Sequence, residues 1–111
     1  MNSHTDFCNY ITSMHFLYRQ NTEGGYVVQV LPRIKCVDGF SFSVQASKNH
    51  YCYPKNDDGP WDSFEVGYPS PMEPMLLPYI EDIGNPHTES VYANVPIDIV
   101  LLIIDNHGGI A

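Results

Sequence analysis

The stretch Phe40-Ser41-Phe42-Ser43-Val44-Gln45-Ala46-Ser47 decides the fold. Apolar and polar side chains alternate along it, and successive side chains of a β-strand point to opposite faces of a sheet. The alternation therefore predicts a strand with one buried face. Residues 33–37 alternate in the same way, and Val37-Asp38-Gly39 is typical of a tight turn. We expect a hairpin made of 33–37 and 39–47.

Further strands are expected on both sides of this hairpin. Residues 26–31 are rich in β-branched side chains, and 63–67 and 90–95 are short runs with the composition of strands. A strand is also expected at 14–18, where the apolar positions fit no helical period well. Residues 1–10 are polar and are expected to be flexible. These segments predict a single α+β domain, 1–111, whose antiparallel sheet has four to five strands.

The segment 97–106 predicts a C-terminal helix packed against this sheet. Pro96 suits a helix start, and Gly108-Gly109 suits a helix end. A buried strand is the alternative, because the run is rich in β-branched residues. Residues 99–104 are apolar on every side, so such a helix needs more cover than one sheet face. The proline-rich segment 69–83 or a second subunit can supply it, and we expect a homodimer or higher oligomer.

The charge of the chain is strongly acidic. Its 111 residues include 13 acidic and 5 basic side chains, for a net charge of −8. This balance disfavours direct nucleic-acid binding, which requires basic side chains at the phosphates. It suits a soluble protein, and it also suits a protein that docks onto a basic surface.

The cysteines and the first residues bear on the compartment. Cys8, Cys36 and Cys52 are odd in number and have no close pairing, which predicts free thiols in a reducing environment. The first residues lack the basic and apolar runs of a signal peptide. Residues 97–104 are too few to cross a bilayer. We expect a cytoplasmic protein that binds no membrane.

The loop 48–62 is the candidate site. Long loops in small domains are uncommon unless they carry a function. Aromatic rings beside hydrogen-bonding groups can stack a ligand or form the centre of a protein interface. The alternative is that these rings pack onto their own domain. The candidate ligand- or partner-binding residues are Gln45, Ser47, Lys48, His50, Tyr51, Tyr53 and Trp61.

The histidine and cysteine residues do not predict an enzymatic reaction. His50 and Cys52 could supply two metal ligands, but a zinc site needs a second pair and the other two cysteines are isolated. The same two side chains could act as base and nucleophile, but no orienting carboxylate or oxyanion loop accompanies them. The sequence predicts no catalytic residue, no metal site and no cofactor, and therefore no enzyme.

Several strings resemble a set of small phage- and prophage-encoded proteins. They are FSVQAS (42–47), HYC (50–52), GP (59–60), EVGYPS (65–70), LPYIED (77–82), VY (91–92), VP (95–96) and HGGI (107–110). The resemblance spans residues 37–111 and carries no catalytic residue over. It implies a viral protein that acts in the cytoplasm of a host bacterium.

The resemblance and the acidity together give three functional hypotheses. The first is an accessory protein that inhibits a bacterial defence system by binding a host defence protein, in the manner of an acidic anti-CRISPR inhibitor. The second is a sponge that sequesters a nucleotide-derived immune signal. The third is a virion or assembly component. The expected partner is thus a host protein or a signal molecule.

Overall fold

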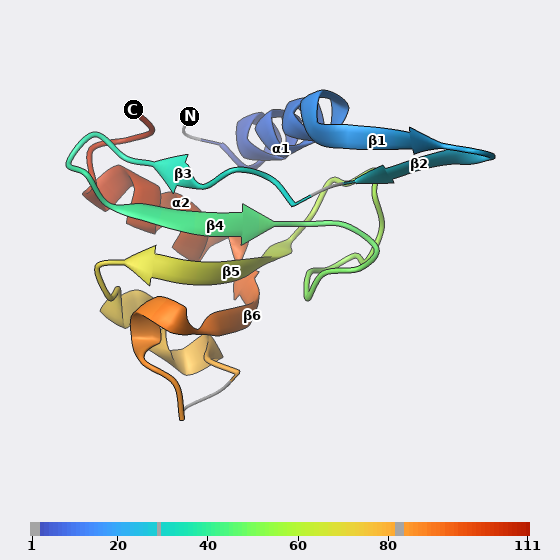
Figure 1. Ribbon diagram of the computed structural model, residues 1–111. Coiled ribbons are helices and arrows are strands. Elements are labelled where there is room, and N and C mark those ends of the chain that lie inside the picture. Colours follow the sequence, from blue (N-terminus) through green and yellow to red (C-terminus); the bar gives the residue numbers. More distant parts are fainter. Residues whose placement is uncertain (1–2, 29, 82–83) are drawn as a thin grey trace.

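The computed structural model describes residues 3–28, 30–81 and 84–111. It contains two α-helices, two 3₁₀-helices and two antiparallel sheets within these residues (Figure 1). The elements are α1 (His4–Tyr18), β1 (Arg19–Thr22), β2 (Gly25–Val28), β3 (Ile34–Lys35), β4 (Ser41–Gln45), β5 (Ser63–Ser70), η1 (Pro74–Tyr79), η2 (His87–Glu89), β6 (Val91–Pro96) and α2 (Ile97–Asn106). The predicted α+β class, the antiparallel sheet and the C-terminal helix are confirmed.

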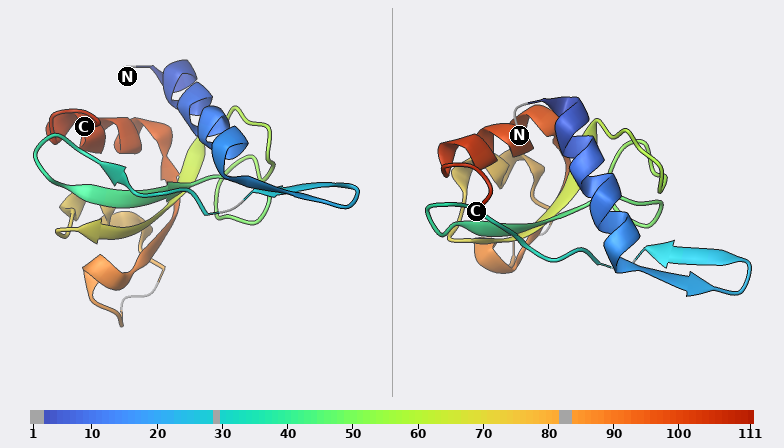
Figure 2. Two further views of the ribbon diagram at one scale, coloured as in Figure 1. Left: turned by 45° about the horizontal axis from the view of Figure 1, so that its top comes forward. Right: turned by 90° about the horizontal axis from the view of Figure 1, so that it is seen from above.

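The larger sheet has the strand order β3-β4-β5-β6, with every neighbouring pair antiparallel. The predicted hairpin is confirmed, because Ile34 pairs with Phe42 and Lys35 with Ser41. Gly39 lies in the turn between them with φ +98°, a conformation that strains residues with a side chain. The helices α1 and α2 lie against one face of this sheet (Figure 2).

The strand predicted at 26–31 joins a different sheet. β2 pairs with β1 as a separate two-stranded hairpin, with Tyr26 opposite Asn21 and Val27 opposite Gln20. This hairpin projects from the body of the molecule (Figure 1). Residue 29 of the predicted strand, and residues 82–83 of the proline-rich segment, lie outside the described residues.

The inward face of β4 follows the predicted alternation. Phe40, Phe42, Val44 and Ala46 are all buried. Gln45 belongs to the other set of the alternation but is buried too, because its side-chain amide bonds the backbone of Leu31. Gln45 Nε2 donates to Leu31 O at 2.9 Å, and the Leu31 N–H donates to Gln45 Oε1 at 2.8 Å. The amide thus bonds the Leu31 peptide groups as a neighbouring strand would, and within the described residues these groups have no other partner.

The strand predicted at 14–18 is wrong, because these residues complete helix α1. Ser3 caps the helix by accepting a hydrogen bond from the Asp6 N–H at 3.0 Å. The helix also includes residues 4–10, which were expected to be flexible. Its buried stripe consists of Phe7, Cys8, Ile11 and His15. A histidine in the stripe broke the apolar period and concealed the helix.

The C-terminal helix α2 ends as its glycines predicted. Gly108 and Gly109 both have φ +89°, and the Gly109 N–H donates to Ile104 O at 2.9 Å. The helix is not covered on every side, because Leu102 is exposed. η1 lies beside its last turn, where Asn106 Nδ2 contacts Met75 Sδ. Neither α-helix of the described residues combines the length and apolarity that crossing a bilayer requires.

Replacing Gln45 by leucine should destabilise the fold. The change leaves the buried N–H and C=O of Leu31 without partners, which costs roughly 2–3 kcal/mol of the free energy of unfolding. Urea titration followed by circular dichroism measures the difference. Asn9→Leu, at an exposed amide on α1, is the matched control and should change stability little. Equal stability of Gln45→Leu and wild type would contradict the role of the amide.

Replacing His15 by leucine should have the opposite effect. The His15 ring is buried, and among the described residues neither of its nitrogens has a hydrogen-bond partner. Removing an unsatisfied buried polar group should raise the free energy of unfolding by about 1–2 kcal/mol. His50→Leu is the control, since its Nδ1 is hydrogen-bonded and its loss should destabilise. A lower melting temperature for His15→Leu would mean that the ring has a partner in solution.

Candidate functional site

The predicted binding residues separate into an inner and an outer set. Gln45, Ser47 and Trp61 are buried, and His50 is partly buried. Lys48, Tyr51 and Tyr53 are exposed. The structure therefore does not bring the seven side chains to one surface. The buried side chains of Gln45, Ser47 and Trp61 cannot contact a partner without rearrangement of the loop.

Trp61 anchors the loop to the core and presents no ring to solvent. Its exposed fraction is 2%, and its Nε1 donates to Asn56 O at 3.1 Å. A Cβ on Gly59 would lie 2.8 Å from the indole, so the loop backbone is in close contact with the ring. Trp61 therefore packs onto its own domain, which was the alternative to a binding role for the aromatic rings of the loop. Stacking of a ligand on this indole is not available in the structure.

Ser47, His50 and Cys52 form a local hydrogen-bonded turn. Ser47 Oγ lies 2.6 Å from His50 Nδ1, and Cys52 Sγ donates to Ser47 O at 3.2 Å. Burial lowers the pKa of His50 and raises the pKa of the Cys52 thiol. A neutral imidazole beside a hydroxyl can act as a base, but this hydroxyl is buried and a substrate cannot reach it. The hydrogen bonds of Ser47, His50 and Cys52 therefore stabilise the conformation of the loop.

The cysteines are free, as their spacing predicted. Cys8, Cys36 and Cys52 are all buried and unpaired. Cys8 Sγ accepts a hydrogen bond from the Trp61 N–H at 3.3 Å and lies 3.4 Å from Trp61 O, so α1 is joined to the loop. Over 3–28, 30–81 and 84–111, no three His, Cys, Asp or Glu side chains are grouped as metal ligands.

The outer set is presented by a firmly held backbone. Tyr51 and Tyr53 are 52% and 65% exposed and flank the buried Cys52. The Tyr51 N–H donates to Glu65 Oε1 at 3.0 Å, and its carbonyl accepts from the Asn94 N–H at 3.0 Å. Tyr53 O accepts from the Asp62 N–H at 2.8 Å. Two rings on a backbone fixed at these points can bind a partner with little loss of backbone entropy.

Lys55 completes this outer surface. Its Nζ lies 5.7 Å from the centroid of the Tyr51 ring, within the range of a cation–π contact. We call Tyr51, Tyr53 and Lys55 the tyrosine face. Lys55 lies in the candidate loop, but its contact with Tyr51 could not be read from the sequence. The tyrosine face can form the aromatic centre of a protein interface.

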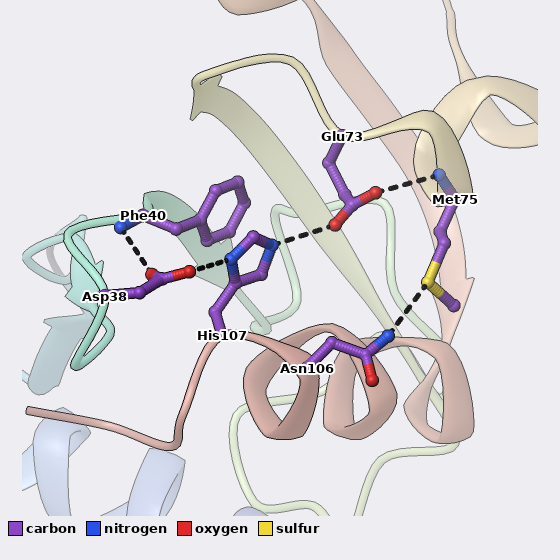
Figure 3. A network of polar contacts seen from close by, with 6 residues as sticks. All are labelled: Asp38, Phe40, Glu73, Met75, Asn106 and His107. Atoms are coloured by element: carbon purple, nitrogen blue, oxygen red, sulfur yellow. Dashed lines mark hydrogen bonds and ion pairs between the residues drawn. The ribbon is translucent and has the colours of Figure 1, made fainter.

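His107 lies at the centre of a polar network that the sequence did not predict (Figure 3). Its Nδ1 lies 2.6 Å from Asp38 Oδ2, and its Nε2 lies 3.0 Å from Glu73 Oε1. The Phe40 ring stacks on the imidazole with centroids 4.1 Å apart. Both ring nitrogens are engaged, so neither is free to take a proton from a substrate. The network joins the β3–β4 turn, the start of η1 and the end of α2.

The contacts of this network shift the pKa values of His107 and Asp38. Burial alone would lower the pKa of His107, but the hydrogen bonds that its ring donates to the Asp38 and Glu73 carboxylates outweigh burial and raise the pKa. The Phe40 N–H and then the His107 side chain lower the pKa of Asp38. The two carboxylates therefore favour the protonated form of the His107 ring. Its partners come from distant parts of the chain, and no local pattern could have indicated them.

A second surface surrounds the β1–β2 hairpin and was also not predicted. Arg19 Cζ lies 4.6 Å from the Phe16 ring centroid and 4.9 Å from the Tyr26 ring centroid. The guanidinium therefore joins the end of α1 to β2. We call the exposed apolar side chains of this region the hairpin patch, which consists of Phe16, Leu17, Tyr18, Tyr26, Val27 and Val30.

A hollow of about 330 Å³ lies between α1 and the end of the candidate loop. Its lining residues are Thr5, Cys8, Asn9, Thr12, Asp58 and Pro60. The volume is at the lower end for small-molecule sites. The lining includes a carboxylate and no basic side chain, so it does not suit a phosphate group.

Comparison with protein-family models, curated proteins and solved structures finds no match for this chain.

The His107 network should make stability depend on pH. Because the pKa of His107 is raised in the fold, its stabilisation is present below the ordinary value of 6.5 and is lost as pH rises through the folded pKa. The melting temperature should therefore fall above pH 6.5 in the wild type, and this fall should be absent in His107→Gln. Thermal melts across this pH range measure the difference.

His4→Gln is the matched control for this experiment. His4 also pairs with a carboxylate, that of Asp98, but both groups are exposed and such pairs contribute little. Its pH profile should follow the wild type. Parallel profiles for wild type and His107→Gln would show that the network carries no charge-dependent stability.

Proposed function

We propose that this chain is a phage-encoded accessory protein that inhibits a bacterial defence system by binding a host defence protein. It acts in the cytoplasm of the host and is not an enzyme. The binding surface in this proposal is the tyrosine face. The observation that carries the proposal is the exposure of Tyr51 and Tyr53 on a loop that is already held by hydrogen bonds and by buried anchors.

Preorganised tyrosines are well suited to protein recognition. A tyrosine ring offers a large contact area for only two side-chain torsions, and its hydroxyl can bond to polar groups of the partner. Cys52 and Trp61 hold the loop from inside, so binding does not have to order its backbone. Low ordering cost converts more of the contact energy into affinity.

The charge beside the tyrosine face supports a basic partner. Residues 56–65 contain four acidic side chains and no basic one. They are Asp57, Asp58, Asp62 and Glu65. Proteins that hold nucleic acid have basic surfaces, and an acidic surface is complementary to them. Steering by opposite charge would also accelerate the encounter.

The hydrogen bonds of His107 and the burial of Cys52 support a binding role over a catalytic one. His107 has a carboxylate on each nitrogen, and the Cys52 thiol is buried with a raised pKa. The signal-sponge and virion hypotheses stay predictions, because no contact or cavity of the described residues favours either of them.

The test is a plating assay in two isogenic bacterial strains, one with and one without an active CRISPR–Cas system. Expression of the wild-type chain should restore plaque formation by a targeted phage in the first strain. The double variant Tyr51→Ala/Tyr53→Ala should lose this effect, since interface aromatics contribute about 2 kcal/mol or more each. Binding to the purified effector complex, measured by interferometry, should weaken by at least about tenfold.

Tyr68→Ala is the control, because Tyr68 is also an exposed tyrosine but lies on β5. It should retain inhibition, and all variants should keep the wild-type melting temperature. Binding should weaken as salt is raised from about 50 mM to about 500 mM, because screening reduces attraction between exposed charges. Restored plating that persists in the double variant would remove the tyrosine face from the proposal. Failure to restore plating in any defended strain would remove the function.

A further inference from the structure

The β1–β2 hairpin has no core of its own. Within the described residues, β1 and β2 pair only with each other, and all four side chains of β1 are exposed. A two-stranded hairpin in water is marginally stable unless further strands or a packed layer cover it. The hairpin therefore has the features of an element that is completed by a second chain.

The hairpin patch exposes a large apolar surface. Leu17 and Val30 are 73% and 70% exposed, and Phe16 is 64% exposed. Since a large side chain offers about 150–250 Å² when fully exposed, the six residues together leave roughly 600 Å² in water. Tyr26 and Val27 are adjacent on β2 and point to opposite faces of the hairpin, so this surface surrounds the hairpin and is not one flat patch. Its total is at the upper end of the patches on ordinary monomers, about 300–600 Å², and below the roughly 800 Å² that each partner of a stable interface buries.

The patch is also partly rigid. The Arg19 guanidinium lies between the Phe16 and Tyr26 rings, at 4.6 and 4.9 Å from their centroids. These two contacts hold the end of α1 and the strand β2 in one arrangement. A surface held in this way loses less freedom when it is covered.

The distribution of charge indicates what covers it. Residues 14–30 contain one basic and one acidic side chain, Arg19 and Glu23, so the net charge of −8 lies entirely outside this segment. Two copies of so acidic a chain repel each other wherever their acidic surfaces meet. The hairpin region is therefore a part of the chain through which two copies can approach with little of that repulsion.

We propose that the hairpin patch is the homodimer interface, and that the occupant of the patch is the same patch of a second copy. A twofold axis places each hairpin against its equivalent, which is the usual arrangement of dimers. The exposed face of α2, which the sequence suggested for subunit contacts, is then not the interface. The dimer does not depend on the proposed inhibitory function, because the tyrosine face belongs to a different segment.

The test is sedimentation velocity of the purified chain from low micromolar to submillimolar concentration. The wild type should convert from monomer to dimer, and the dimer should persist or strengthen at about 500 mM salt, because screening weakens repulsion between the acidic bodies. The variant Leu17→Lys/Val27→Lys should remain a monomer throughout. Both positions are exposed in the monomer, so its melting temperature at low concentration should match the wild type.

Leu102→Lys is the matched control, since Leu102 is an exposed leucine on α2. It should dimerise like the wild type. Hydrogen exchange gives a second readout: amides of residues 19–28 should exchange more slowly as the wild-type concentration rises, and should not do so in Leu17→Lys/Val27→Lys.

Two outcomes would overturn the proposal. One is a wild type that stays monomeric over the whole range at both salt concentrations. The other is a dimer that Leu102→Lys dissociates and Leu17→Lys/Val27→Lys does not, which would assign the interface to α2. If a monomeric wild type loses effector binding on Leu17→Lys/Val27→Lys, the occupant of the patch is the defence protein rather than a second copy.

Discussion

The arrangement of the loop 48–62 depends on the packing of the Trp61 ring in the core. Its ring packs edge-on against His15 of α1 and tilts against Phe64 of β5, with centroids 5.4 and 6.2 Å apart. Its backbone is bonded to Cys8 Sγ, and its Nε1 to Asn56 O. One side chain thus connects the first helix, the central sheet and the loop 48–62. Because the indole occupies the inner side of the loop, the tyrosines at 51 and 53 are left on the outer side.

A second set of long-range contacts holds the other end of the molecule. His107 connects to Asp38 across 69 positions and to Glu73 across 34 positions of the chain. Glu73 is buried, so an opposite charge within hydrogen-bond distance offsets the cost of removing its carboxylate from water. The same ring stacks on Phe40, the buried residue that directly precedes β4. The end of α2 is therefore held by a charged and an aromatic contact together.

The two exposed surfaces differ in the physical basis of recognition. The tyrosine face combines two rings and a lysine with neighbouring carboxylates, so binding there should respond to salt and to the charge of the partner. The hairpin patch has almost no net charge and a large apolar content, so its association should rely on removing apolar surface from water. In the two proposals, attraction between copies of this acidic chain is confined to the hairpin patch, and the tyrosine face is left for a partner of opposite charge.

The sequence by itself determined the elements that depend on near neighbours. The period-2 alternation of residues 40–47 gave β4 and its inward face, and the turn at 37–39 gave its pairing with β3. Pro96 and Gly108-Gly109 set the limits of α2, because these residues act on the backbone within one turn. The position of the loop 48–62 could be predicted from the sequence, but which of its side chains are buried and which are exposed could not.

Only the tertiary structure decided the features that depend on distant residues. His15 is buried in the stripe of α1 because Trp61 packs on it, although nothing near position 15 favours a buried imidazole. β2 joins β1 rather than the larger sheet, and its own composition suits either partner. The burial of Trp61, the pairing of His107 with two carboxylates and the exposure of the hairpin patch all arise from contacts between segments. Local patterns specify how a segment folds, whereas packing between segments decides which side chains remain in water.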